Sequence, residues 1–382
     1  MLHLDTKNKV LSATVISILL LGMIAGLIVI PTAKAGSVSA NPTYTFTIAS
    51  NSTSNYVLAR NGSIMSSGSV DSVFSAAFGY IKNGENLTVR SGEYIAANTL
   101  LMSSGNNLLI NFEYGSLLTL ANGVDASVLR LNYCNNILIQ GVNIDGNSAN
   151  EYSNYLSDGV LFYDSGNCTL TNSNITNCAG NGFAVMEEHY MKPSNTISNT
   201  NITYCHWNGM TIGHGAGYLN ATYVLNNDIS HCTDVGITLY ITNNTVVSNN
   251  YIHDMDGTLL SAHSGGGASW GIGRESSGAM YAQFINNTIV NCETGIDLAD
   301  GQSSLVKGNN ITNCNNPIMF DGYADQSYNN GFNVITQNTF VNWNYRVTYH
   351  HAAIFCYHSD QNIFSFNTFI NTNATLSPAE TI

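Results

Sequence analysis

The sequence predicts an all-β fold, a solenoid of stacked coils, from three observations. One phrase recurs from residue 170 onward, in the forms SNITNCAGNGFAV, TNITYCHWNGMTI, NDISHCTDVGITL, NTIVNCETGIDL and NNITNCNNPIMF. Its period lies mostly in the twenties. Each copy offers short alternating strands between turns rich in Asn and Gly. Strands this short bury their inward side chains only by stacking on the next coil, which gives parallel sheets with strands about 4.8 Å apart.

One apolar residue marks the same position in every coil. It is followed by a polar residue, a turn residue and, in most copies, a cysteine. We predict that this column fills the core: Ile175, Ile202, Ile229, Ile252, Ile289, Ile311, Phe340 and Phe369. The longest step, from Ile252 to Ile289, contains the Gly-rich insertion HSGGGASWGIGRESSGAM.

Five cysteines share one repeat position and therefore form a second column. They are Cys178, Cys205, Cys232, Cys292 and Cys314. Neighbours in such a column lie about 5 Å apart, within the range that a disulfide accepts. The alternative is a stack of buried free thiols. We favour this alternative because side chains in register on parallel strands point in the same direction rather than toward each other. No Cys-x-x-Cys pair occurs, so the sequence predicts no zinc site.

A helix is expected before the first coils, in the segment DSVFSAAFGYIK. Asp71 is the predicted N-cap, and five apolar residues lie on one helical face: Val73, Phe74, Ala77, Phe78 and Ile81. With these repeats, the chain resembles a single-stranded right-handed parallel β-helix of the pectate-lyase superfold. Its repeats are similar to those of the carbohydrate-binding and sugar-hydrolase (NosD-like) group. The resemblance covers residues 69–375 and implies that the helix near 71–82 caps the core.

The first 35 residues predict export. Lys7 and Lys9 precede an apolar stretch at 10–30, and Ala33-Lys34-Ala35 follows it as a cleavage pattern. The stretch is also long enough to be an uncleaved membrane anchor. We favour a cleaved signal peptide, and the anchor is the alternative. Either way the rest of the chain is expected to be secreted or at the cell surface. Residues 36–68 are predicted as a small β segment and 376–382 as a tail.

The amino-acid composition limits the classes of partner that this chain is expected to bind. Only 9% of residues are charged, the net charge is -13, and the 11 Lys and Arg form no basic cluster. Nucleic acid is therefore not an expected partner. Contact with a membrane is expected only through an uncleaved N-terminal segment, and the sequence predicts no oligomeric state.

Polygalacturonases of the same superfold provide a motif test. Asp158-Gly159 matches their first aspartate segment, but Gly180-Asn181 stands where they carry paired aspartates. His214, although it lies between two glycines, follows its strand where the family histidine precedes one. The sequence therefore does not predict inverting hydrolysis by that family's aspartate set.

A different grouping emerges at the ends of successive strands. In each coil we count along the strand that follows the repeated Cys and turn residues. The same count reaches Asp164, Glu187 and His214 in successive coils, which places them in one solvent-facing line with steps of about 5 Å. Two carboxylates at that spacing suit a retaining glycosidase pair or a shared calcium ion. We assign Glu187 as acid/base, Asp164 as nucleophile or metal ligand, and His214 as proton relay. The competing interpretation is that the exposed turns of any solenoid carry Asp, Glu and His.

Substrate-binding residues are expected beside this line. Four continue it or lie one step away: Tyr240, His263, Asp300 and Asp321. Two more come from the Gly-rich insertion, predicted as a loop over the groove. There Trp270 would stack on a sugar ring and Arg274 would neutralise a uronate carboxylate.

The sequence thus predicts an exported β-helix that engages polysaccharide along one face. As an enzyme it would be a polysaccharide lyase or glycosidase. The alternative is a non-catalytic surface protein, such as an adhesin, an envelope component or a NosD-like accessory factor. Calcium is the one cofactor that the carboxylates would accept, and no dedicated metal site is assigned.

Overall fold

The computed structural model describes residues 45–52, 55–150, 157–189, 194–214, 221–255, 269–274, 281–299, 302–321, 330–343, 353–357 and 359–370. The predicted signal or anchor at 1–35 and the tail at 376–382 lie outside these residues. Within them, no helix has both the length and the apolar character needed to cross a membrane.

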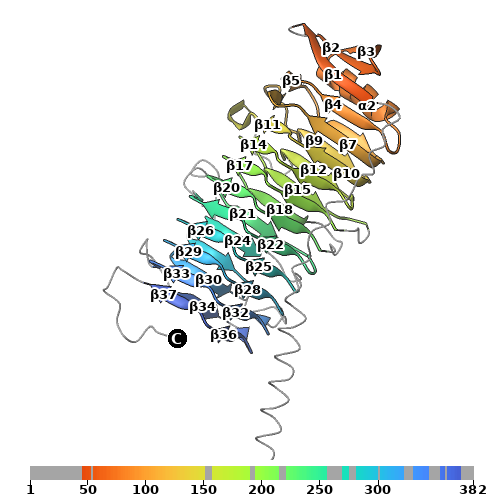
Figure 1. Cartoon of the computed structure of the whole chain (residues 1–382). Helices are drawn as coiled ribbons and strands as arrows, with labels where there is room; N and C mark the ends of the chain where they lie inside the picture. The colour runs from red at the N-terminus through yellow and green to blue at the C-terminus, as the bar shows by residue number, and fades with distance from the viewer. Residues whose placement is uncertain are drawn as a thin grey trace, which may run out of the picture. The chain divides into compact units, whose positions relative to one another are not determined.

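The described residues form a right-handed parallel β-helix with three long sheets, which we call A, B and C (Figure 1). Along most of the chain each coil contributes one strand to A, then one to B, then one to C. Neighbouring coils pair in parallel, so each sheet runs along the axis of the helix. This confirms the predicted fold class.

The strands of each sheet are as follows. Sheet A contains β3 (Ser63–Gly68), β2 (Asn55–Arg60), β1 (Thr45–Ser52), β4 (Asn86–Val89), β7 (Asn106–Phe112), β10 (Asn135–Gln140), β13 (Thr169–Thr171), β16 (Thr196–Ser198), β19 (Tyr223–Leu225), β22 (Val246–Ser248), β25 (Gln283–Ile285), β28 (Leu305–Lys307), β32 (Val334–Thr336) and β36 (Ile363–Ser365). Sheet B contains β5 (Gly92–Ala96), β8 (Ser116–Leu120), β11 (Asn143–Asp145), β14 (Asn174–Thr176), β17 (Asn201–Thr203), β20 (Asp228–Ser230), β23 (Tyr251–His253), β26 (Thr288–Val290), β29 (Asn310–Thr312), β33 (Thr339–Val341) and β37 (Thr368–Ile370). Sheet C contains β6 (Leu100–Ser103), β9 (Leu129–Asn132), β12 (Val160–Tyr163), β15 (Phe183–Met186), β18 (Met210–His214), β21 (Val235–Leu239), β24 (Trp270–Arg274), β27 (Thr294–Asp297), β30 (Asn316–Asp321) and β34 (Ile354–Tyr357). A two-stranded sheet pairs β31 (Asn330–Gly331) with β35 (Ser359–Asp360), and a 3-10 helix, η1, spans Ser148–Asn150.

The N-terminal end carries an antiparallel extension and the predicted capping helix. Strands β1 to β3 pair antiparallel with one another, and β1 joins the parallel strand β4. Helix α2 (Val70–Tyr80) buries Val73, Phe74 and Ala77 against the first coils. The predicted N-cap is wrong, because Ser69 accepts the hydrogen bond from the backbone N–H of Ser72. Asp71 lies in the first turn and accepts from the backbone N–H of Ala97 instead.

The predicted core column is in register throughout sheet B. Ile175 pairs with Ile202, Ile202 with Ile229, and the pairing continues to Phe340 and Phe369. Every member but the last is fully buried. The 37-residue step from Ile252 to Ile289 therefore changes the length of one coil but not the register of this sheet.

The cysteine column consists of buried free thiols, as the second alternative predicts. Each Sγ–H points to the backbone carbonyl two residues earlier, at 3.5 to 3.7 Å. Burial raises the pKa of Cys232 well above its usual value. These thiols pack as small apolar side chains beside the isoleucines.

A column of glycines lets sheet B approach the start of sheet C. At each of these glycines an added Cβ would meet the Cγ2 atom of the core isoleucine and a backbone carbonyl of the next coil. The column contains Gly159, Gly182, Gly209, Gly236, Gly271 and Gly295. The recurring Gly of the repeat is therefore required for space.

Buried asparagines tie the coils together between sheets A and B. From the second member onward, Oδ1 of each accepts from both the backbone N–H and the Nδ2 group of the ladder residue one coil earlier. The first member, Asn227, accepts from the backbone N–H of Thr200. The ladder contains Asn227, Asn250, Asn287, Asn309, Asn338 and Asn367. Satisfying backbone groups in this way replaces the water that a buried turn excludes.

Substituting Asn287 by alanine is expected to lower the free energy of unfolding by about 2 to 4 kcal/mol, because it leaves buried donors of Asn250 without their acceptor. Urea denaturation followed by circular dichroism measures this change. Asn310→Ala, at an exposed position on sheet B, is the control and should change stability by less than about 0.5 kcal/mol. Equal effects of the two substitutions would contradict a stabilising ladder.

Candidate functional site on sheet C

A cluster of polar side chains on sheet C lies where β12 and β15 end. Asp164 follows β12 in a left-handed conformation, with φ of 44°, which aspartate tolerates better than most residues. Its backbone N–H donates to the carbonyl of Met186 on β15. This turn carries the Asp164 carboxylate across to the segment that follows the neighbouring strand.

The Asp164 carboxylate holds the end of the next coil. Its Oδ1 accepts from the backbone N–H groups of Glu188 and His189, at 3.0 and 3.3 Å. Its Oδ2 lies 2.8 Å from Nδ1 of His189. The carboxylate is fully buried, whereas the His189 side chain is 54% exposed. A buried aspartate thus orients an exposed imidazole through Nδ1, which leaves Nε2 as the nitrogen for proton transfer with a ligand.

A tyrosine and an arginine lie beside this pair. The Tyr163 hydroxyl donates to Oε2 of Glu188 at 2.6 Å. This hydrogen bond is the main reason that the pKa of Tyr163 is raised to about 12. The Arg130 guanidinium, on β9, lies 4.5 Å from the centre of the Tyr163 ring. Tyr133 meets the same ring edge-on, with the centroids 6.1 Å apart.

The cluster therefore combines three chemical roles within three successive coils. His189 offers an imidazole oriented by a carboxylate, Tyr163 keeps its proton at neutral pH, and Arg130 supplies positive charge at the same face. Tyr133, which is exposed, adds an aromatic surface of the kind that packs against sugar rings.

The predicted line of Asp164, Glu187 and His214 is only partly present. Asp164 and Glu187 follow β12 and β15 in register, but both side chains are fully buried rather than solvent-facing. His214 pairs with Met186 instead of Glu187, because a bulge at Gly213, with φ of 89°, adds one residue to β18. The line of three solvent-facing side chains is therefore wrong.

His214 instead contacts Tyr240, one of the predicted substrate-binding residues. Their rings meet edge-on with the centroids 5.0 Å apart, and both side chains are partly exposed. This pair lies along sheet C from the His189 cluster, in the direction of the C-terminus.

The Gly-rich insertion contributes a strand where a loop was predicted. Trp270 and Arg274 are the ends of β24, which continues sheet C after β21. Gly271 on this strand occupies the glycine column, as the repeat glycine does in the other coils. The Trp270 ring lies against Gly273 on the same strand and is partly exposed.

The other predicted substrate-binding positions are less fully described. His263 and Asp300 lie outside the described residues. Asp321 is the last residue of β30, and only its backbone is described.

Asp158, which matches the first polygalacturonase aspartate, does not reach the surface. It is fully buried, and its Oδ1 accepts from the backbone N–H and the Nδ2 group of Asn181. Burial raises the pKa of Asp158 to about 7. The match therefore marks a position that links coils rather than a catalytic one.

Sequence reasoning missed His189, Glu188, Tyr163 and Arg130. A signal for two of them was present, since the strand exit MEEH contains Glu188 and His189 one coil after Asp164. Counting the same number of residues from the start of each strand selected Glu187 instead.

The structure assigns no cation site. Among the residues that it describes, no three His, Cys, Asp or Glu side chains form a group that could hold a metal ion. Calcium therefore stays a prediction from the sequence.

Comparison with solved structures shows that the chain shares its fold with other β-helix proteins. The A-module of mannuronan C-5 epimerase AlgE4 from Azotobacter vinelandii is 16% identical, with a TM-score of 0.54, over 82% of this chain and 94% of that one. The family 28 exopolygalacturonase of Yersinia enterocolitica is 13% identical, with a TM-score of 0.55, over 84% and 81%. The GH136 lacto-N-biosidase of Eubacterium ramulus is 13% identical, with a TM-score of 0.55, over 78% and 64%. At such identities the likeness concerns the fold.

A comparison with curated proteins found no match. A family model for the right-handed β-helix region matches residues 127–269 and 268–377, which is more than half of the chain. The repeats, the three parallel sheets and this match agree. The chain belongs to the right-handed β-helix region family.

Proposed function

We propose that the chain is an extracytoplasmic enzyme that removes the proton at C-5 of a uronic-acid residue in a polysaccharide. This step is common to elimination and to C-5 epimerisation. The observation that carries the proposal is the buried Asp164 carboxylate that orients the exposed imidazole of His189. The names of the similar structures, which include a mannuronan C-5 epimerase and an exopolygalacturonase, support a carbohydrate substrate.

Each nearby side chain has a role in this reaction. Nε2 of His189 accepts the C-5 proton, and the electron pair passes toward the uronate carboxylate, whose charge Arg130 offsets. In elimination the bond to the C-4 oxygen then breaks, and the Tyr163 hydroxyl donates the proton to that oxygen. In epimerisation that bond stays intact, and the Tyr163 hydroxyl instead donates a proton to C-5 from the opposite side. A tyrosine whose pKa is about 12 is protonated at neutral pH, so its proton is present for this step.

Burial argues against the glycosidase alternative. A glycosidase pair needs two carboxyl groups that reach the sugar. Asp164 and Glu187 are both fully buried, so neither presents its carboxylate to a polysaccharide.

Wild-type protein in deuterated water is expected to place deuterium at C-5 of one polyuronate within a panel of alginate, polygalacturonate and glucuronan. Nuclear magnetic resonance detects this exchange, and ultraviolet absorbance of unsaturated ends shows whether elimination follows. His189→Ala should slow the exchange by about 10²- to 10⁴-fold, because it removes the base.

The control is His206→Ala, a histidine in the turn before β18 that has no role in the proposed reaction. It should retain wild-type rates. Wild-type protein that exchanges no C-5 proton in any of these polymers, with or without calcium, would contradict the proposed reaction. Fractionation of cells that make the chain tests the proposed location, which predicts that the protein lies outside the cytoplasm.

A further inference from the structure

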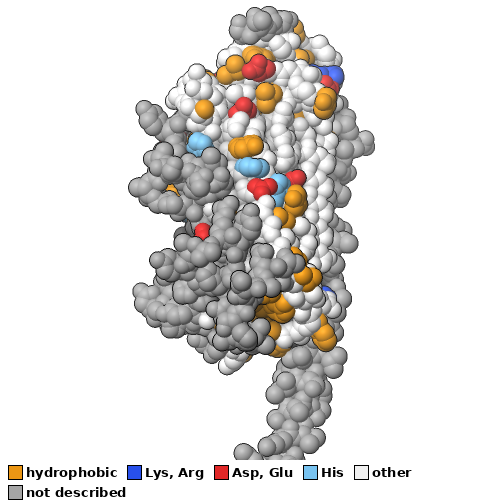
Figure 2. Space-filling view, turned by 90° about the vertical axis from the view of Figure 1, so that its left-hand side faces the viewer, with side chains coloured by type: hydrophobic (Ala, Val, Ile, Leu, Met, Phe, Trp, Pro, Cys, Tyr) orange, Lys and Arg blue, Asp and Glu red, His pale blue; other side chains and the backbone are white. Residues whose placement is uncertain are grey.

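The outer face of sheet B carries a chain of four rings, which we call the ring strip: Tyr204, His231, His253 and Tyr251. Tyr204 stacks on His231 with centroids 4.8 Å apart, His231 meets His253 edge-on at 6.2 Å, and His253 stacks on Tyr251 at 4.1 Å. Both tyrosines are exposed. Figure 2 shows histidine, acidic and hydrophobic side chains gathered at one uncovered place on the side of the molecule where β17 and β20 lie.

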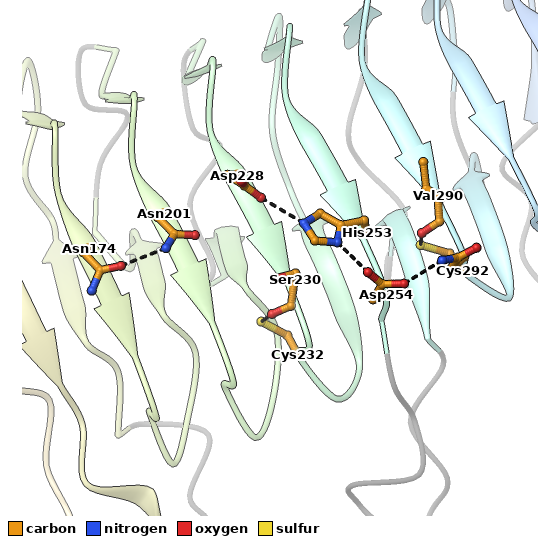
Figure 3. A network of polar contacts seen from close by, with 10 residues as sticks. Asn174, Asn201, Asp228, Ser230, Cys232, His253, Asp254, Val290 and Cys292 are labelled. Atoms are coloured by element: carbon orange, nitrogen blue, oxygen red, sulfur yellow. Dashed lines mark hydrogen bonds and ion pairs between the residues drawn. The ribbon is translucent and has the colours of Figure 1, made fainter.

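Two carboxylates are held beside the rings. Nδ1 of His253 lies 2.7 Å from Oδ2 of Asp254, and Nε2 lies 3.1 Å from Oδ1 of Asp228 (Figure 3). Asn291 donates to the other oxygen of Asp254 at 2.6 Å. The hydrogen bonds from Asn291 and His253 lower the pKa of Asp254, so it stays ionised. Asp228 and Asp254 are 53% and 41% exposed, so both carboxylates reach solvent.

Under the strip, the residue type at one turn position differs from that in the other coils of the sheet, although the backbone conformation is the same. From Ile175 to Phe340, the residue two places after each member of the core column is left-handed, with φ between 52° and 57°. Asparagine, which tolerates this conformation best among residues with a side chain, holds the position at Asn177, Asn291, Asn313 and Asn342. Three consecutive coils between them carry Tyr204, His231 and Asp254 instead.

This departure is unfavourable for the fold itself. Tyrosine adopts left-handed backbone less readily than asparagine, and such strain concentrates at functional positions. Two of the three substituted positions, Tyr204 and His231, supply rings of the strip, and the third, Asp254, is hydrogen-bonded to His253 of the strip. The amide row beside them, in which Asn201 donates to Asn174 at 2.9 Å, continues to Asp228 along the axis.

We propose that the ring strip is a second polysaccharide-binding site, which takes an uncharged glycan and performs no chemistry. Exposed aromatic rings provide surfaces for the apolar faces of sugars, and the carboxylates and amides accept and donate hydrogen bonds to hydroxyl groups. Asp228 and Asp254 repel an anionic chain. The alternation of rings with polar groups leaves no continuous apolar area of the kind that a protein partner covers. The strip lies on a different sheet from the His189 cluster and does not depend on that site being catalytic.

The test is calorimetric titration of the full chain with hexaoses of cellulose, xylan, mannan and β-1,3-glucan. At least one is expected to bind. Tyr204→Asn should then lower its affinity at least tenfold while leaving the free energy of unfolding unchanged or higher, because asparagine restores the residue that the backbone prefers. Tyr251→Ala should weaken binding to a similar degree.

Two controls separate this site from others. Tyr114→Ala removes a fully exposed tyrosine elsewhere and should bind as the wild type does. His189→Ala should also retain the affinity, whatever its effect on polyuronates. The proposal is overturned if none of the hexaoses binds, or if Tyr204→Asn and Tyr251→Ala both bind with wild-type affinity. Loss of binding in His189→Ala alone would assign the glycan to sheet C instead.

Discussion

Gly209→Ala is expected to lower the free energy of unfolding by about 3 kcal/mol or more. A Cβ at this position would lie 2.6 Å from the carbonyl oxygen of Gly236 and in collision with Cγ2 of Ile229. The carbonyl belongs to the parallel ladder and the isoleucine is fully buried, so neither can move without disturbing the next coil. Overpacking of a well-packed core usually costs about 1 to 3 kcal/mol, and a backbone contact raises that figure. Urea denaturation measures the change.

Gly79→Ala is the matched control for the same chemical change. Gly79 lies in helix α2 with no neighbouring atom within 4 Å of an added Cβ. Alanine there should stabilise the protein by about 0.5 to 1 kcal/mol, through helix propensity. Adding Ile229→Leu to Gly209→Ala removes the colliding methyl group and should recover part of the loss. A Gly209→Ala protein as stable as the wild type would show that the coils are not packed this closely.

Asp158→Asn is expected to remove a fall in stability that the wild type shows between about pH 4 and pH 7. Burial raises the pKa of Asp158 from 3.8 in the unfolded chain to about 7 in the fold. The folded state therefore binds more protons than the unfolded state in this window, and stability decreases as the pH rises. The contribution is fully present below pH 3.8 and lost above about pH 7. The shift corresponds to about 4 kcal/mol at most.

The readout is the slope of the free energy of unfolding against pH, not its absolute value. Glu93→Gln, which changes an exposed carboxyl group, should leave the slope as it is in the wild type. If Asp158→Asn keeps the wild-type slope, the carboxyl group is not protonated in the fold. Such a result would also remove the argument that its match to the polygalacturonase motif is structural.

The fold could be predicted from the sequence because the same packing requirements recur in every coil. Ile202 and Ile229 pair as predicted, since each coil buries the same side chain at the same place. The Cys and Gly of the phrase follow from the same packing. The long step before Ile289 did not disturb this prediction, because Ile252 and Ile289 remain paired although the coil between them is longer.

The candidate site was harder to predict because it depends on departures from the repeat. The bulge at Gly213 shifts His214 by one residue, and no count along the chain reveals it. The left-handed turn at Asp164 directs its carboxylate to His189, a contact between two coils. The strand β24 at Trp270 lies where the sequence predicts a loop, and Gly271 in the glycine column is the feature that marks it as a strand of sheet C.

The central claim is that polysaccharide binds on sheet C at the ends of β12 and β15. A crystal structure of the His189→Ala protein with a tetrasaccharide of the polyuronate that the wild type processes tests it most directly. We expect a uronate residue whose carboxylate contacts Arg130 and whose C-5 lies beside the position of the missing imidazole, within reach of the Tyr163 hydroxyl. A tetrasaccharide bound on another face, with this cluster open to solvent, would contradict the claim.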